Sequence, residues 1–419
     1  MLLLNNILKI IILIIGDLFS FLFGFLTALI IRYRFSFDKI IFLNGLWYFI
    51  PVFFIWILIF FIFRLYELIY LTNRKEFFER LFKISLFNII GAIIYFYIFS
   101  SSHYRPSLVL MLTVFFSLFY VIIWRIFANK ILRFRKIKIV FETNNARAEE
   151  LKQIILSNPQ LGYEISEKIV EGAKNIIIQD LISDISYDRN ISYLSLEEFY
   201  ELICHKVPLD LINDYWFHQI LTHHNYFYET LKRIADIIFG ILLLVISLPI
   251  WPIIAFLIKI DSPGEVIYRS VRIGRNRKPF YIYKFRTMVK NANKIGPAWT
   301  LENDPRITKV GKILRKTHLD EVPQVLNIIK GDISFVGPRP EEETLVNLYE
   351  KEIPFYRYRH LIKPGVIGWA QINYPQSSSL EDARHKLEYD FYYFKTRNLF
   401  FDFIIALKAW RIPFEIPTH

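Results

Sequence analysis

Four long apolar segments near the N-terminus constrain this chain more than any other feature. They cover residues 7–31, 46–63, 84–100 and 107–124. Each approaches the roughly 20 residues that a helix needs to cross the hydrocarbon core of a bilayer. Hydrophobic residues also make up 54% of the chain, a high share for a soluble protein. We therefore predict a membrane protein with four transmembrane helices over residues 1–130.

The positive charges that flank these segments predict their orientation. The connection at 64–83 and the stretch that follows the fourth segment contain eleven Lys and Arg, whereas the other two connections contain four. Connections rich in Lys and Arg stay on the cytoplasmic side of a membrane. We therefore expect the N-terminus and the chain after residue 130 to face the cytoplasm.

One acidic residue, Asp17, lies inside the first apolar segment. Acidic residues at such positions mark ion pathways in some membrane proteins. The neighbouring spans offer Asp17 no evident partner in the sequence. We therefore favour a structural or interfacial role for Asp17 over a transport function.

A small α/β module is expected at residues 137–205. The segments KIKIVF and KNIIIQD indicate strands, and ARAEELKQIIL and SLEEFYELI indicate helices. Ser195 and Glu198 form a capping box at the start of the second helix. A dinucleotide site would need glycines after the first strand, and no glycine occurs between 136 and 161. We interpret this module as a degenerate Rossmann-like unit with a structural or regulatory role, joined to the next part by a linker at 206–231.

A fifth apolar segment, at residues 237–258, presents a choice between a full span and a re-entrant helix. Ser247, Pro249 and Pro252 lie in its middle, and proline there removes a backbone donor and bends a helix. A full span would carry everything after residue 260 across the membrane. We therefore predict a re-entrant membrane helix over 232–260, broken at Ser247 and Pro249. A full span with the last part outside is the alternative.

The basic character of the chain is concentrated just after this segment. Between Lys259 and Lys316 there are fifteen Lys and Arg against four acids, which accounts for most of the formal net charge of +12. Such a region suits an anionic partner, namely a phosphorylated small molecule, an anionic lipid or a nucleic acid. The single cysteine, Cys204, excludes an internal disulfide.

Residues 264–340 arrange these cations around two adjacent acids. GEVIYRSVRIGRNRKPFYIYKFRTM is typical of a β-hairpin. We expect two of its residues, Lys284 and Arg286, to bind substrate. Asp320 and Glu321 follow a cationic helix, and alone they would be read as a solvated helix face. In the GPRP turn proline restricts the backbone, which pre-positions the guanidinium of Arg339 for phosphate.

Six blocks carry a resemblance to a known family. They are KRIADIIFG, KIDSPGEVIYRSVRIG, YKFRTM, NDPRITKVGKILRKTHLDEVPQ, GDISFVGPRP and KPGVIGWAQIN. In this order they resemble the bacterial sugar transferases, which are monotopic polyprenyl-phosphate phosphoglycosyl transferases, over about residues 232–412. The upstream membrane segment and α/β module are similar in architecture to the large form of that family, which includes exopolysaccharide and O-antigen initiating enzymes.

The resemblance implies an activity and a location. It implies an α+β catalytic domain over 261–419, on the cytoplasmic side of the bacterial inner membrane. A nucleoside diphosphate sugar, a UDP sugar by the resemblance, would donate phospho-sugar to undecaprenyl phosphate and release UMP. The resemblance also implies a homodimer and no nucleic-acid partner. An inactive scaffold for polysaccharide assembly and an anionic-lipid binding module are the alternatives.

The resemblance also implies roles for individual residues. Asp320 would be the nucleophile that forms a covalent phospho-sugar intermediate, and Glu321 would bind Mg²⁺. The residues that would hold phosphate are Arg315, Pro338, Arg339 and Pro340. These roles are chemically consistent, because a carboxylate attacking an anionic diphosphate needs nearby cations. At Ile367 the family pattern usually has threonine, and if that hydroxyl contacts substrate in the family, the sugar donor would differ here.

Overall fold

The structure is a computed structural model. It describes residues 2–34, 39–68, 75–99, 107–132, 137–170, 175–179, 191–222, 226–290, 292, 304–374 and 379–411. The chain forms two compact units, Met1–Ile203 and Cys204–His419. Each unit has its own secondary structure and core, and each is described by itself below.

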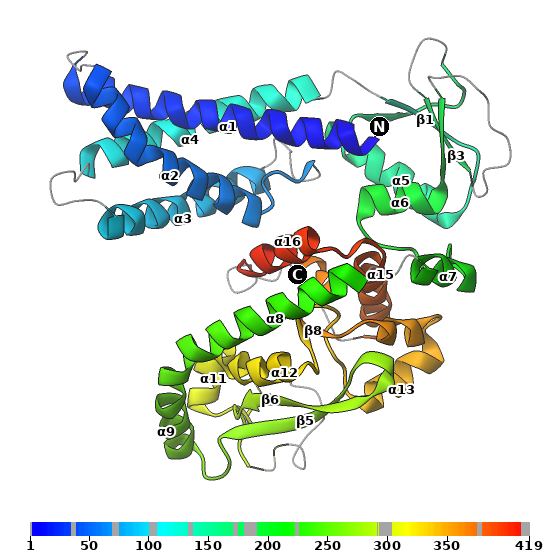
Figure 1. Cartoon of the computed structure of the whole chain (residues 1–419). Coiled ribbons are helices and arrows are strands. Elements are labelled where there is room, and N and C mark those ends of the chain that lie inside the picture. The colour runs from blue at the N-terminus through cyan, green and yellow to red at the C-terminus, as the bar shows by residue number, and fades with distance from the viewer. Residues whose placement is uncertain are drawn as a thin grey trace. The chain divides into compact units, whose positions relative to one another are not determined.

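The first unit begins with four long helices (Figure 1). They are α1 (Leu2–Tyr33), α2 (Lys39–Ile62), α3 (Lys75–Phe99) and α4 (Ser107–Leu132). Each contains a stretch long and apolar enough to cross a membrane. This agrees with the predicted fold class. The second and third helices begin earlier than predicted, because their polar first turns still place apolar residues at helical spacing.

Helices α1 and α4 pack closely through small residues. A Cβ added to Gly16 would overlap the ring of Trp124, and one added to Gly24 would overlap Ser117. Small residues let the backbones of membrane helices approach each other, which strengthens van der Waals packing. The aromatic rings of Phe21 and Trp56 extend this core toward α2.

The expectation that Asp17 lacks a partner is wrong. The Nη2 of Arg125 lies 2.5 Å from Oδ2 of Asp17, and both side chains are fully buried. Arg125 also donates to the carbonyl of Leu65. The sequence prediction ended the fourth span before Arg125, whereas α4 continues to Leu132. Arg125 is therefore part of the helix packing and not of a charged connection.

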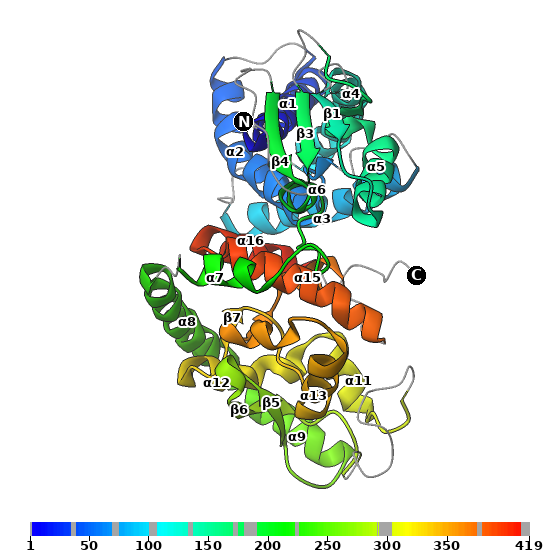
Figure 2. The ribbon, with the colours of Figure 1, turned by 90° about the vertical axis from the view of Figure 1, so that its right-hand side faces the viewer.

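The α/β module forms a four-stranded parallel sheet in the order β2-β1-β3-β4. The strands are β1 (Ile137–Phe141), β2 (Tyr163–Ile165), β3 (Asn175–Gln179) and β4 (Ile191–Ser195). Two helices, α5 (Ala146–Ser157) and α6 (Leu196–Cys204), accompany the sheet (Figure 2). Both predicted strands and both predicted helices are confirmed. Strands β2 and β4 were not predicted, because neither segment contains a long apolar run.

Side chains cap both helices of this module. Ser195 Oγ accepts from the N–H of Glu198, and the N–H of Ser195 donates to the carboxylate of Glu198, so the predicted capping box is confirmed. Asn145 Oδ1 accepts from the N–H of Ala148 at the start of α5. The turn after β1 therefore satisfies an N-terminal amide of α5 with a side chain.

The segment expected to be a linker, 206–231, belongs instead to the core of the second unit. It contains α7 (Asp214–Thr222) and the start of α8 (Tyr226–Ser247). Val207, Trp216 and Phe217 are buried in one cluster with Leu387 and Phe391. Local patterns in this short stretch do not show which distant helix will cover its apolar side chains. The sequence therefore predicted a linker here.

The rest of the second unit consists of helices around short strands (Figure 1). Its strands are β5 (Ile267–Ile273), β6 (Pro279–Phe285), β7 (Ser334–Val336) and β8 (Gly365–Ile367). The helices described after residue 300 are α11 (Lys309–Lys316), α12 (Val325–Lys330), α13 (Glu343–Glu352), α14 (Trp369–Asn373), α15 (Leu380–Thr396) and α16 (Leu399–Ala409). Strands β5 and β6 form the predicted antiparallel hairpin.

The fifth apolar helix is interrupted in its middle. Helix α8 (Tyr226–Ser247) is followed by a 3₁₀ turn (Leu248–Ile250) and by α9 (Trp251–Asp261), which leaves in another direction (Figure 1). Pro249 and Pro252 each lie in the first turn of a new helical segment, where a backbone N–H is not needed. Trp251 Nε1 donates to Ser247 Oγ across the break. The break therefore lies at the residues chosen from the sequence.

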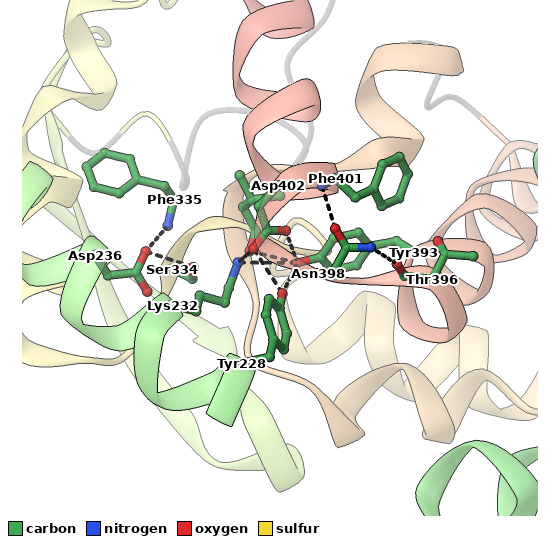
Figure 3. A network of polar contacts seen from close by, with 11 residues as sticks. Tyr228, Lys232, Asp236, Ser334, Phe335, Tyr393, Thr396, Asn398, Phe401 and Asp402 are labelled. Carbon is green, nitrogen blue, oxygen red and sulfur yellow. Dashed lines mark hydrogen bonds and ion pairs between the residues drawn. The ribbon is translucent and has the colours of Figure 1, made fainter. Parts of the chain in front are cut away.

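Polar contacts attach α8 to the rest of the second unit (Figure 3). Asp402 on α16 accepts from Tyr228, Lys232 and Tyr393 at 2.9, 2.5 and 2.8 Å. One turn along α8, Asp236 accepts from Ser334 Oγ and from the N–H of Phe335. These contacts connect the apolar helix to α16 and to β7. No local pattern in the sequence marks Asp236 or Asp402 for these contacts.

Candidate active site

The two adjacent acids lie in a 3₁₀ turn, Leu319–Gln324, that follows α11. Helix α11 begins with Thr308, whose side chain accepts from the N–H of Gly311. His318 then adopts a left-handed conformation with φ of 55°. Few non-glycine residues adopt this conformation, and it reverses the chain so that the turn can begin. Asp320 is buried, with 8% of its surface exposed.

Asn327 holds this turn beside the hairpin. Its side chain is fully buried. The amide oxygen accepts from the N–H of Tyr283, and the amide nitrogen donates to the carbonyl of Tyr281. Since Tyr281 and Tyr283 belong to β6, the next residue along that strand, Lys284, is carried to the acidic pair.

Glu321 is paired with two cations. Lys284 Nζ lies 2.7 Å from Oε1 of Glu321, and Arg339 Nη2 lies 2.5 Å from the same oxygen. Arg339 Nη1 also donates to Oε2 at 3.3 Å. Both carboxylate oxygens therefore accept from a guanidinium, in the fork geometry that arginine favours.

Asp320 differs from its neighbour. Among the residues that the structure describes, it makes no hydrogen bond and no ion pair, although it is the more buried of the two acids. Three cationic or titratable side chains, Lys284, Arg315 and His318, act on it electrostatically. The carboxylate thus has no direct polar contact, and the negative Glu321 and these three side chains act on it through space.

The different surroundings move the pKa values of the two acids in opposite directions. Burial, and then the negative charge of Glu321, raise the pKa of Asp320 above its ordinary value, against the opposing cations. Burial alone would raise the pKa of Glu321 too, but Arg339 and Lys284 hold it well below its usual range. Adjacent carboxyl groups with separated pKa values are typical of sites where the two groups have different tasks.

Arg315 lies at the end of α11, before the acidic turn. Its Nε donates to Thr287 Oγ1 at 2.9 Å. A buried ion pair precedes this helix, with Arg306 Nη2 at 2.6 Å from Asp304 Oδ2. Arg315 is therefore positioned beside Asp320 by a hydroxyl group, while the nearby Asp304 is neutralised by Arg306.

The loop after β7 carries Arg339. Strands β7 and β8 pack so closely that a Cβ on Gly365 would overlap the backbone of Gly337. The N–H of Gly365 donates to the carbonyl of Pro338 at 2.9 Å. Arg359 then donates to the carbonyl of Arg339, which holds this loop in place.

Two residues that support the loop were missed by sequence reasoning. Arg359 Nε lies 2.7 Å from Asp390 Oδ2, and both side chains are buried. Pro340 receives a further hydrogen bond from Arg272 through its carbonyl. Asp390 lies on α15, far along the chain, so no local pattern marks the pair.

Arg286 does not contact the acidic pair, because its guanidinium is bonded elsewhere. Its guanidinium donates to the carbonyls of Ser262 and Pro263, just after α9. The adjoining Gly264 has φ of 131°, and a Cβ there would meet the Arg286 guanidinium. In this structure Arg286 joins the hairpin to the end of the membrane helix, whereas Lys284 reaches the acids. Ile367 lies on β8 and accepts from the N–H of Gly337.

The residues present fit a Mg²⁺ ion only in part. Within the described residues, no three acidic, histidine or cysteine side chains gather into a metal-binding set. Mg²⁺ is commonly held by one or two carboxylates, with water and substrate phosphate oxygens completing its octahedron. Glu321 offers such a carboxylate, provided that Lys284 and Arg339 exchange their contacts with it for contacts with the incoming phosphates.

Known proteins match this half of the chain. The model of the bacterial sugar transferase family matches residues 227–415. An Aeromonas hydrophila protein named UDP-N-acetylgalactosamine-undecaprenyl-phosphate N-acetylgalactosaminephosphotransferase is 42% identical over 184 residues, which are 44% of each chain. An Escherichia coli UDP-glucose:undecaprenyl-phosphate glucose-1-phosphate transferase is 41% identical over 178 residues, which are 42% of this chain and 38% of that protein.

A shorter relative is matched over most of its length. The exopolysaccharide production protein PSS of Rhizobium leguminosarum is 40% identical over 169 residues, which are 39% of this chain and 84% of that protein. The matches to the Aeromonas and E. coli proteins, in contrast, span less than half of their length. The matched region contains the acidic turn, the hairpin and the loop of Arg339. The chain therefore belongs to the bacterial sugar transferase family.

Proposed function

We propose that this chain transfers a phospho-sugar from a nucleoside diphosphate sugar to polyprenyl phosphate and thereby begins the assembly of a polysaccharide or glycoconjugate. The donor is a UDP sugar and the acceptor is undecaprenyl phosphate, since the names of two relatives include both compounds. The observation that carries the proposal is the buried, unpaired carboxylate of Asp320 among cations, beside a second acid that is fully paired.

The first step of the proposed reaction uses Asp320 as the nucleophile. A carboxylate oxygen of Asp320 attacks the phosphorus that bears the sugar, and the bond from that phosphorus to the bridging oxygen breaks. UMP leaves with the bonding electrons, and an aspartyl phospho-sugar remains on the enzyme. Covalent catalysis of this kind divides one difficult transfer into two easier ones.

In the second step the phosphate of undecaprenyl phosphate attacks the same phosphorus. The Asp320 carboxylate leaves, and undecaprenyl-diphosphate-linked sugar is released. The donor and acceptor thus react in turn, in a ping-pong mechanism. Lys284, Arg315 and Arg339 stabilise the negative charge on the phosphoryl oxygens, because fixed cations in a partly buried site offset anionic repulsion.

Mg²⁺ held by Glu321 would neutralise the diphosphate of the donor. The chain itself contributes the position of Glu321, which the turn Leu319–Gln324 keeps adjacent to the nucleophile. Release of Lys284 and Arg339 from Glu321 would make both cations available to the substrate. Pro338 and Pro340 flank Arg339 and limit the motion of its backbone while its guanidinium binds the substrate phosphates.

The apolar helices support a membrane location for this reaction. Within the described residues, α8 and α9 expose apolar side chains that include Ile238, Phe239, Val245 and Phe256. Helix α16 exposes Phe400 and Phe403, together with Trp410 just after its end, and buries Ile405 on the other side. We propose that α8 and α9 enter and leave the same leaflet of the bacterial inner membrane, with the catalytic unit in the cytoplasm. The homodimer stays a prediction.

The proposed mechanism is tested by trapping the intermediate. Purified protein in detergent is mixed with a panel of UDP sugars and Mg²⁺ without acceptor, and tryptic peptides are measured by mass spectrometry. A phospho-sugar adduct on Asp320, and its loss when undecaprenyl phosphate is added, would support the proposal. Binding of donor without any adduct or UMP release would instead favour an inactive scaffold.

A further inference from the structure

A second cationic pocket lies apart from the acidic turn. It has a volume of about 390 Å³ and opens beside the first turns of α8. Asp320, Glu321, Lys284 and Arg339 do not line it. Its walls come from α8, from the turn between β5 and β6, from the segment before β8 and from the end of α15. Five cations contribute to these walls: Lys232, Arg233, Arg275, Lys363 and Arg397.

Most of these cations are already engaged. Arg275 and Arg397 approach the same carboxylate, that of Glu229, at 3.0 and 3.7 Å. Lys232 is paired with Asp402, which Figure 3 shows beside Tyr228 and Tyr393. Two acids line the pocket, Glu229 and Asp236, against five cations, and Asp236 accepts from Ser334 and from the N–H of Phe335.

Arg233 bonds to backbone rather than to an acid. It donates to the carbonyls of Ile328 and Ile329 at 2.6 Å each. These carbonyls belong to the last turn of α12, whose acceptors lack partners within the helix. Hydrogen bonding to carbonyls leaves the full charge of the guanidinium, so Arg233 contributes uncompensated positive charge to the pocket.

Lys363 is the cation with no direct partner. Among the described residues it forms no hydrogen bond and no ion pair, and it is half-buried. Burial, and then the positive charge of Arg233, lower its pKa, while the negative charges of Asp236 and Glu229 act in the opposite direction. A partly desolvated ammonium group beside another cation is unfavourable unless an anion accompanies it. The pocket thus has room for an anion and an excess of positive charge.

An apolar stripe leads away from this pocket along α8. Ile234, Ile238 and Ile241 are spaced as neighbours on one helix face, and 48%, 58% and 49% of their surfaces are exposed. Ile234 also lines the pocket. A ligand with a charged head and an apolar chain would match both features at once, with the head near Lys363 and the chain along the stripe.

We propose that this pocket binds the phosphate group of an anionic membrane lipid, whose acyl chains lie along the apolar stripe of α8. Basic pockets beside membrane helices are suited to anionic headgroups. A free phosphate ion has the same charge, but it would leave the stripe uncovered. Such a lipid would hold α8 at a defined depth, independently of the transfer chemistry.

The test measures binding directly and requires no turnover. Full-length protein in detergent is titrated, in separate experiments, with phosphatidylglycerol, phosphatidylcholine and inorganic phosphate, and bound species are counted by native mass spectrometry. The wild type should bind phosphatidylglycerol more tightly than phosphatidylcholine. Lys363→Gln should weaken phosphatidylglycerol binding about fivefold, and Lys363→Arg should retain it.

A matched control removes the positive charge of a lysine that lies outside the pocket. Lys330 is 65% exposed and pairs with Asp332 on the surface. Lys330→Gln should bind phosphatidylglycerol as the wild type does, and thermal unfolding should show that all variants are folded. Equal affinity in wild type and Lys363→Gln, or an equal loss in Lys330→Gln, would overturn the proposal. Binding of inorganic phosphate without a preference for phosphatidylglycerol would overturn the lipid assignment.

Discussion

Asp320 and Glu321 are neighbours in one 3₁₀ turn, yet they have opposite electrostatic surroundings. Glu321 accepts from Lys284 and Arg339, whereas Asp320 makes no direct polar contact with any described residue. The pKa of Glu321 is lowered, and that of Asp320 is raised. One acid is therefore part of a stable ion-pair network, and the other is available for chemistry.

Replacement of Asp320, the proposed nucleophile, should lower activity without lowering stability. Asp320→Asn should reduce turnover by a factor on the order of 10³ or more, since no other group replaces the attacking oxygen. The same change removes a buried, unpaired charge, so the melting temperature should stay equal or rise. UMP release and thermal unfolding are measured on the same preparation. Unchanged turnover would rule out Asp320 as the nucleophile.

Glu321→Gln should have the opposite effect on stability. The change leaves Lys284 and Arg339 without an anionic partner, at a cost of about 1–3 kcal/mol in the free energy of unfolding. Because the pKa of Glu321 is lowered, its stabilising contribution is present above its ordinary pKa and is lost as the pH falls through the lowered one. Denaturant unfolding at several pH values measures this difference. The exposed control Glu352→Gln should show no such loss.

Metal dependence provides an independent test of Glu321. Removal of Mg²⁺ by a chelator should abolish UMP release, and Glu321→Gln should require a higher Mg²⁺ concentration for half-maximal activity. The reason is that Glu321 is the carboxylate proposed to complete the coordination of the ion with substrate phosphates. Identical Mg²⁺ titration curves for the variant and the wild type would exclude this ligand role.

The acid limb of the pH profile should report the ionisation of Asp320. The nucleophile must be ionised, so the rate of UMP release should rise with pH through the raised pKa of this carboxyl. Arg315 lowers the pKa of Asp320, and Arg315→Gln should therefore shift the acid limb to higher pH. Arg357→Gln, at a side chain that is 68% exposed, should leave the limb in place. A shift to lower pH in Arg315→Gln would contradict this assignment.

The contacts of Asp402 should make a large contribution to the attachment of α8. Asp402→Asn weakens the contacts with Lys232, Tyr228 and Tyr393, and it should destabilise the second unit by about 2–3 kcal/mol. Tyr228→Phe removes one hydroxyl and should cost about 1 kcal/mol. Thermal unfolding in detergent compares the two. Equal effects would show that the charge of Asp402 is unimportant.

The buried pair in the membrane helices should show strong coupling. Asp17→Asn or Arg125→Gln alone leaves one buried group without its partner and should cost about 3–5 kcal/mol. The double variant should cost less than the sum of the two, because neither charge remains. A double-mutant cycle from denaturant unfolding measures this coupling, and additive effects would show that the two side chains act independently.

Several parts of this protein followed from local sequence patterns. The four apolar helices depend on composition over about 20 residues, and the capping box of Ser195 and Glu198 depends on residues three apart. Pro249 and Pro252 interrupt the fifth helix through their own rings. Each of these features is determined within one contiguous segment of the chain, so the sequence alone predicts it.

The partners of the charged residues, in contrast, were decided by the tertiary structure. Glu321 meets Lys284 and Arg339 through the packing of a strand and a loop against its turn, and Asp17 meets Arg125 from another helix. The sequence placed Lys284 and Arg286 together, but they point to different partners. Helical and strand periodicity specify which face a residue occupies and not which distant face it will meet. Long-range packing therefore determined which acid of the pair remained without a partner.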